Sequence, residues 1–75
     1  MDKENILKEV VECVKSLGGN VTHYCYRNGE PFNIKVEVED YKEVNIDALK
    51  DAIDDIDSVD YMGRSYGEFY FKLIH

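Results

Sequence analysis

The chain has no tryptophan, a single proline and only two cysteines. Two cysteines are too few for the disulfide framework that stabilises small secreted domains, so we expect reduced thiols. No apolar run is long enough to span a bilayer, and residues 1–5 are charged where a signal peptide would be hydrophobic. At 75 residues, the chain is predicted to be one cytoplasmic domain, 1–75, near the lower size limit for a single core.

Basic residues are also scarce, with nine Lys and Arg against 16 Asp and Glu, which gives a net charge of -7. Residues 37–60 hold ten of the acidic residues against Lys42 and Lys50, so this segment carries -8 and the remainder +1. Such a distribution argues against duplex nucleic acid as a partner, because that binding depends on Lys and Arg at phosphates. It argues equally against anionic membrane surfaces.

Two segments have the apolar spacing of amphipathic helices. The first spans residues 2–17 and is capped by Asp2, and Gly18-Gly19 ends it, since glycine readily adopts the left-handed conformation. The second begins after Asn45, which can cap it. Their apolar stripes are Ile6, Leu7, Val10, Val11, Cys13, Val14 and Leu17 in the first, and Ile46, Leu49, Ala52, Ile53 and Ile56 in the second.

The first pair of strands is predicted from Asn28-Gly29, which favours a two-residue type I′ loop because both positions need a positive φ. Closing the hairpin there pairs Cys25 with Phe32 and turns Cys25 and His23 toward the core. We therefore expect Cys13 and Cys25 both to resist labelling in the folded protein. The same register turns Thr22, Tyr24 and Tyr26 outward.

The second pair of strands is predicted to turn through a three-residue loop, Ser65-Tyr66-Gly67, with Gly67 in the left-handed conformation. A two-residue loop at Tyr66-Gly67 would direct Asp60 and Arg64 toward the core. The three-residue loop instead forms favourable pairs on the outer face of the sheet, namely Asp60 with Lys72, Met62 with Tyr70, and Arg64 with Glu68.

These elements predict an α+β two-layer sandwich in the order αββαββ, with two helices on one face of a four-stranded antiparallel sheet. The two halves, 2–40 and 45–75, also resemble each other. An Asn-Ile pair opens each helix, and a Gly-Glu pair opens the second strand of each hairpin. An internal αββ repeat is therefore an open hypothesis.

Residues that could carry chemistry do not form a recognisable catalytic or metal-binding motif. Cys13, His23 and Cys25 offer three ligands where structural zinc needs four. Residues 54–60 are rich in aspartate, but a calcium loop starting at residue 55 would require a glycine where Asp60 stands. A weak surface cation site there stays open. We predict no metal, no cofactor and no enzymatic activity.

Two features remain as candidate binding surfaces. The second helix places carboxylates at i+4 spacing and at the negative end of its dipole, at a cost of a few tenths of a kcal/mol each. The outer sheet face is expected to gather tyrosines with residue types that are enriched at interfaces. The predicted partner-binding residues are Asp47, Asp51, Asp54, Asp55 and Asp57 on the helix, and Tyr24, Tyr26, Met62, Arg64 and Tyr70 on the sheet.

From these surfaces we predict a small, acidic, non-catalytic protein-binding module. One form of this function is an inhibitor that occupies the basic, nucleic-acid-binding surface of a partner protein. The alternative is a sheet-face binder of single-stranded nucleic acid or a small molecule through exposed tyrosines. A homodimer formed through the sheet face is compatible with either function.

Overall fold

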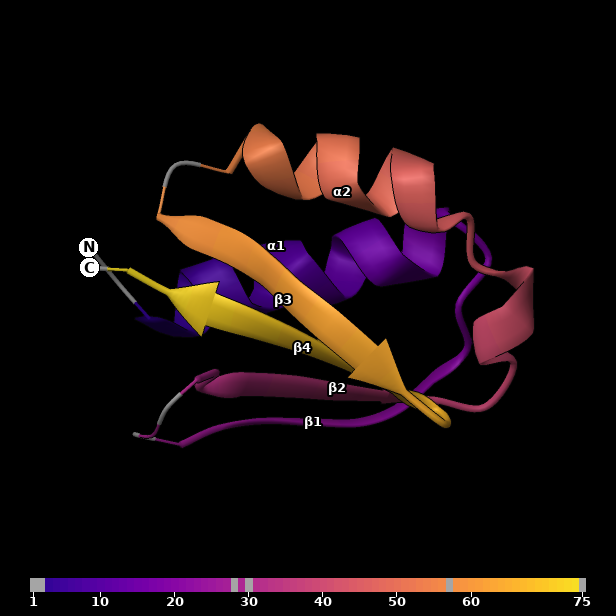
Figure 1. Cartoon of the computed structure of the whole chain (residues 1–75), viewed down its shortest axis with the longest axis horizontal. Helices are drawn as coiled ribbons and strands as arrows, with labels where there is room; N and C mark the ends of the chain where they lie inside the picture. Colours follow the sequence, from indigo (N-terminus) through magenta and orange to yellow (C-terminus); the bar gives the residue numbers. More distant parts are fainter. Residues whose placement is uncertain (1–2, 28, 30, 57, 75) are drawn as a thin grey trace.

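The computed structural model describes residues 3–27, 29, 31–56 and 58–74. Two helices cover one face of a four-stranded antiparallel sheet, so the predicted α+β sandwich is confirmed (Figure 1). The elements in chain order are α1 (Lys3–Ser16), β1 (Val21–Tyr26), β2 (Ile34–Val38), the 3-10 helix η1 (Tyr41–Glu43), α2 (Ile46–Asp54), β3 (Val59–Ser65) and β4 (Glu68–Leu73).

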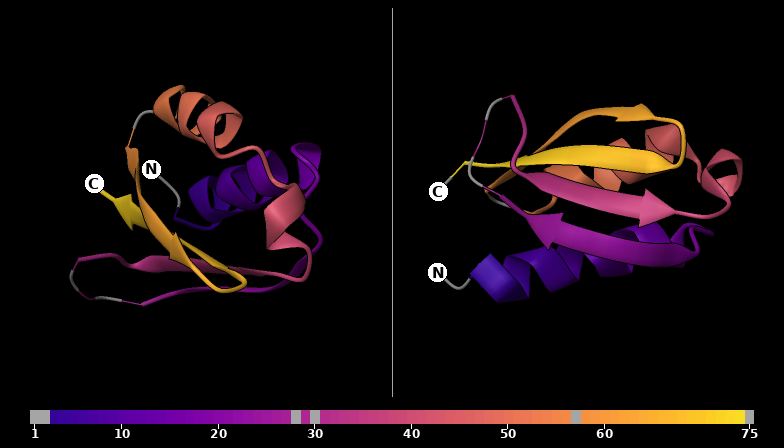
Figure 2. Two further views of the ribbon diagram at one scale, coloured as in Figure 1. Left: turned by 45° about the vertical axis from the view of Figure 1, so that its right-hand side comes forward. Right: turned by 90° about the horizontal axis from the view of Figure 1, so that it is seen from below.

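The strand order in the sheet is β1-β2-β4-β3. The second strand of each hairpin is therefore central, and the first strand of each hairpin is at an edge. Both helices lie on the same side of the sheet, which leaves the other face without a covering layer of described residues (Figure 2). An antiparallel sheet can expose one face in this way if its strands alternate apolar and polar residues.

The core lies between the helices and the sheet. About half of each predicted helical stripe is fully buried in it, and the remaining stripe residues are partly buried at its margin. Asn45 caps α2 as predicted, because its side-chain oxygen accepts a hydrogen bond from the Ala48 N–H at 3.1 Å. Gly18 follows α1 with a φ of 100°, in the left-handed region. The predicted cap at Asp2 lies outside the described residues. The buried apolar residues are Ile6, Val10, Val11, Val14, Ile34, Val36, Val38, Val44, Leu49, Ile53, Val59, Phe69, Phe71 and Leu73.

The predicted register of the first hairpin is wrong. Tyr26 pairs with Ile34 and Cys25 with Lys35, so residues 27–33 connect the strands in place of a two-residue loop. The shift is an odd number of residues and therefore exchanges the two faces of β1. Tyr24 and Tyr26 face the helices, whereas His23 and Cys25 face outward.

The long connection is explained by Asn33, which is 8% exposed and bonded to β4 through both ends of its amide. Its Nδ2 donates to the Leu73 carbonyl at 3.2 Å, and its Oδ1 accepts from the Leu73 N–H at 2.8 Å. Its backbone N–H donates to the Phe71 carbonyl at 3.1 Å, and its carbonyl accepts from the Arg27 N–H at 2.8 Å. Asn33 therefore holds the end of the loop against both β1 and β4.

The second hairpin combines a correct and an incorrect prediction. Asp60 pairs with Lys72 as expected, and Gly67 has a φ of 71°. The loop itself contains two residues, because Ser65 pairs with Glu68. The loop is thus one residue shorter than predicted. A β-bulge between Tyr61 and Gly63, with Gly63 at a φ of 128°, adds one residue to β3 and restores the predicted pairing of Asp60.

This bulge changes the face on which one predicted site residue lies. Arg64 pairs with Phe69, a fully buried core residue, and not with Glu68. Its position is therefore on the helix side of the sheet. The bulge supplies the extra residue that returns Asp60 to the outer face, which a two-residue loop in a regular ladder could not do.

We expect Asn33→Ala to lower the free energy of unfolding by about 2 to 3 kcal/mol, because it leaves the buried N–H and C=O of Leu73 without partners. Urea denaturation of the two proteins measures the difference. The matched control is Asn20→Ala, which removes an exposed hydrogen bond to Glu39 and should cost less than about 0.5 kcal/mol. Equal losses in the two variants would contradict the structural role of Asn33.

We expect Gly67→Ala to destabilise the fold by about 1 kcal/mol, since an L-residue is disfavoured at its positive φ. Gly29→Ala should be nearly neutral. Gly29 is not among the positive-φ glycines, and an added Cβ would lie an ordinary 3.6 Å from the Phe32 carbonyl oxygen. Thermal denaturation compares the two. A larger loss at Gly29 would support the two-residue turn that the sequence suggested there.

Candidate functional site

The first candidate surface is the acidic face of α2, defined as Asp47, Asp51, Asp54 and Asp55. All four side chains are exposed, and none forms an ion pair within the described part of the chain. Asp57, which was predicted to extend this face, lies outside that part. The helix thus presents four carboxylates that no basic side chain in the described part of the chain neutralises.

The one lysine of α2 does not relieve this charge, because Lys50 is directed to an aromatic ring. Its Nζ lies 5.7 Å from the centre of the Tyr61 ring. Lys50 and Tyr61 also line a shallow hollow with Asp54, Asp60 and Met62. Met62 is 43% exposed and therefore offers apolar surface beside the acidic face. The structure thus brings together Asp54 and Met62, two of the predicted site residues.

A groove between α1 and α2 borders the other side of the acidic face. Cys13, Ala52 and Ile56 form its apolar part, and the acidic residues beside them come from both helices. Burial raises the pKa of the Cys13 thiol, and the charges of Glu9 and Asp55 raise it further. Three carboxylates, those of Glu9, Glu12 and Asp55, therefore share the groove with this thiol and one lysine, Lys8. The groove is lined by Lys8, Glu9, Glu12, Cys13, Ala52, Asp55 and Ile56.

The predicted tyrosine surface is not assembled on the outer sheet face. Tyr26 packs against the core from the helix side, with the Nζ of Lys3 4.8 Å from its ring centre. Tyr24 shares that side at the edge of the sheet and is 43% exposed. Arg64 lies with Tyr41 and Tyr66 in a hollow on the helix side. Of the predicted sheet residues, Tyr70 is the one that the ladder places on the outer face.

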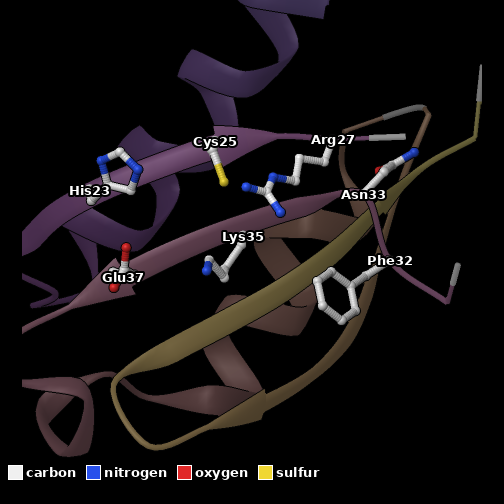
Figure 3. A pocket seen from close by; sticks show the side chains of 7 residues that line it. All are labelled: His23, Cys25, Arg27, Phe32, Asn33, Lys35 and Glu37. Atoms are coloured by element: carbon white, nitrogen blue, oxygen red, sulfur yellow. The ribbon is translucent and has the colours of Figure 1, made fainter. Parts of the chain in front are cut away.

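The outer face instead carries a hollow of about 310 Å³, here termed the sheet hollow (Figure 3). The side chains that the register error had turned inward contribute to it. His23, Cys25 and Arg27 follow one another along the chain at alternate positions, and Lys35 is the cross-strand partner of Cys25. The lining residues are His23, Cys25, Arg27, Phe32, Asn33, Lys35 and Glu37.

A small network on the central strands supports one wall of the sheet hollow. The Phe32 ring stacks on Tyr70 with ring centres 4.2 Å apart. The Tyr70 hydroxyl donates to Glu68 Oε1 at 2.6 Å, and Glu68 Oε2 lies 3.6 Å from the Nζ of Lys35. The hydrogen bond to the Glu68 carboxylate raises the pKa of the Tyr70 phenol, with a smaller contribution from burial.

Sequence reasoning missed the sheet hollow because it placed His23 and Cys25 in the core. Pro31 is the signal that could have prevented the error. A strand starting at residue 30 would place Pro31 in the ladder, where it has no N–H to donate. Taking Pro31 into account would have predicted a longer connection between the strands. A longer connection could have placed His23 and Cys25 on the outer face of the sheet, where the structure has them.

No family model, curated protein or solved structure matches this chain. Within residues 3–27, 29, 31–56 and 58–74, no three His, Cys, Asp or Glu side chains are placed to hold a metal ion. Over the same residues, neither helix has the length and apolar character needed to cross a membrane. Three surfaces are therefore the candidates for function: the acidic face, the groove between α1 and α2 (the helix groove), and the sheet hollow.

We expect Glu68→Gln to lower the pKa of Tyr70 toward its ordinary value of about 10, because the neutral amide no longer favours the protonated phenol. The raised pKa means that the hydrogen bond stabilises the fold below about pH 10 and is lost as the pH rises through the folded-state value. NMR titration of the Tyr70 ring measures this. Glu37→Gln, which removes a nearby charge without touching Tyr70, should leave its titration unchanged.

Proposed function

We propose that this chain is a non-catalytic protein-binding module that docks its acidic face onto a basic surface of a partner protein. The observation that carries the proposal is that the four exposed carboxylates of α2 have no ion-pair partner among the described residues, while Lys50 is directed to Tyr61. Placing like charges at i+4 and at the C-terminal end of a helix destabilises it. A partner with complementary charge would offset that cost.

The surroundings of the acidic face support a protein partner over a simple counterion. Protein interfaces need apolar contacts at their centre as well as complementary charge. Met62 supplies apolar surface on one side, and the groove with Cys13 and Ile56 supplies it on the other. A partner side chain could enter either hollow while its basic residues meet the aspartates.

A nucleic-acid-binding surface is the kind of basic surface that best suits this arrangement. Asp47, Asp51 and Asp55 are spaced four residues apart, so a rise of 1.5 Å per residue separates them by about 6 Å along one side of the helix. A row of regularly spaced negative charges on a rigid rod resembles the charge pattern of a phosphate backbone. By occupying such a surface, the module would inhibit its partner.

The test is a triple variant, Asp51→Asn, Asp54→Asn and Asp55→Asn, which changes the net charge from -7 to -4. The helix should persist or gain slight stability as repulsion is relieved. Partner binding should weaken at least tenfold at low salt, mainly through a slower association rate. A partner is first captured from the native host with the parent protein, and surface plasmon resonance then measures the rates at several salt concentrations.

A matched control removes the same charge elsewhere, through Glu37→Gln, Asp40→Asn and Glu43→Gln. These three residues lie outside the acidic face and the helix groove, so the control reaches the same net charge of -4. It should bind much more tightly than the α2 variant. If both triple variants bind like the parent at low ionic strength, the carboxylates serve solubility and the proposal fails.

A further inference from the structure

The two cysteines of this chain lie in opposite electrostatic surroundings. Cys13 is in the helix groove, where burial, Glu9 and Asp55 raise the pKa of its thiol. Cys25 lies in the sheet hollow between His23 and Arg27 of the same strand segment and across from Lys35 (Figure 3). Both thiols are free and partly exposed. A charged reagent should therefore distinguish between them.

The charges in the sheet hollow are available for a ligand. Arg27 has no side-chain hydrogen bond or ion pair within the described residues. Lys35 is 3.6 Å from Glu68, and both side chains are partly exposed. Such an ion pair contributes at most about 1 kcal/mol, so Lys35 can exchange partners. Two cations that flank one thiol can attract a carboxylate-bearing molecule to it.

The other end of the sheet hollow has the opposite charge. Glu37 lines it and pairs with His23, two pairs further along the ladder from Lys35 and Cys25. It has no ion-pair partner among the described residues. The hollow therefore offers cations at one end and a carboxylate at the other. A ligand that carries carboxylates and an ammonium group would match both ends. A volume of about 310 Å³ is at the lower limit for small-molecule sites.

We propose that the sheet hollow binds small amino-acid-derived disulfides, the class that includes oxidised glutathione, and that Cys25 exchanges with them to form a mixed disulfide. Arg27 and Lys35 hold the carboxylates, and Glu37 holds the ammonium group. The result is a reversible modification that adds a charged group to the uncovered face of the sheet. This inference is independent of the acidic face and of the proposed partner.

The exchange is balanced without any further reactant. Cys25 loses its proton to solvent, and its sulfur attacks one sulfur of the bound disulfide. The Sγ–S bond forms as the original S–S bond breaks. The departing half leaves as a thiolate that takes up a proton. The disulfide is the oxidant. The thiolate of Cys25 supplies the electron pair of the new S–S bond, and the departing sulfur keeps the electron pair of the broken one.

The experiment exposes the parent protein to three disulfides and measures modification of each cysteine by peptide mass spectrometry. Bis(hydroxyethyl) disulfide is neutral, so its rates at the two thiols depend on their accessibility and not on nearby charges. The ratio of its rate at Cys25 to its rate at Cys13 is the reference value. With oxidised glutathione, this ratio should rise at least tenfold, and the rise should shrink as salt increases. With cystamine, which carries ammonium groups and no carboxylates, the ratio should fall below the neutral value because Glu9 and Asp55 attract it to Cys13.

Variants test which side chains produce the selectivity. Arg27→Gln should lower the rate of oxidised glutathione at Cys25 by about three- to tenfold and leave the neutral reagent unaffected. Lys42→Gln removes the same charge from exposed η1 and should change neither rate. Equal ratios for all three disulfides, or equal effects of the two variants, would overturn the proposal. Because both thiols are measured in the same parent sample, the first result does not depend on how a variant folds.

Discussion

The side chain of Asn33 is the contact on which the arrangement of the sheet depends. Its amide bonds both backbone groups of Leu73, so it extends the pairing of β2 with β4 by one position before Ile34, the first residue of β2. Its own carbonyl holds the Arg27 N–H, so the end of β1 is tied to the same point. A buried amide that is fully bonded selects one register, because any slip would leave its polar atoms without partners. The faces of β1 follow from that register.

The resulting molecule separates its charges between two surfaces. The helix layer gathers carboxylates from α1 and α2 around the groove that contains Cys13. The sheet hollow on the opposite face combines Arg27 and Lys35 with Glu37. The net charge of -7 is therefore not spread evenly, because the sheet hollow contains both cations and a carboxylate. Charge counts along the chain identified the acidic surface, whereas the hollow required knowledge of which residues share a face.

Sequence reasoning predicted the elements better than their pairing. The helices were predictable because apolar residues recur at three and four positions, and β2 and β4 because Ile34 to Val38 and Phe69 to Leu73 alternate strictly. In β1, both alternating sets, Tyr24 with Tyr26 and His23 with Cys25, are compatible with either face of the sheet. The alternation of residue types therefore did not determine which set faces the core. The register at the far end of each hairpin, at Val21 in β1 and at Asp60 in β3, also depends on a single extra residue in a bulge, which no local pattern marks.

Both bulges lie in the edge strands of the sheet. One interrupts β1 near Val21, and the other interrupts β3 near Gly63. An unpaired edge is a template on which strands of other chains can assemble into aggregates, and a bulge breaks its regular row of donors and acceptors. A docking strand could form only a few bonds before meeting the irregularity. The extra residues in the two edge strands therefore also disfavour the addition of further strands to a small, sparsely covered sheet.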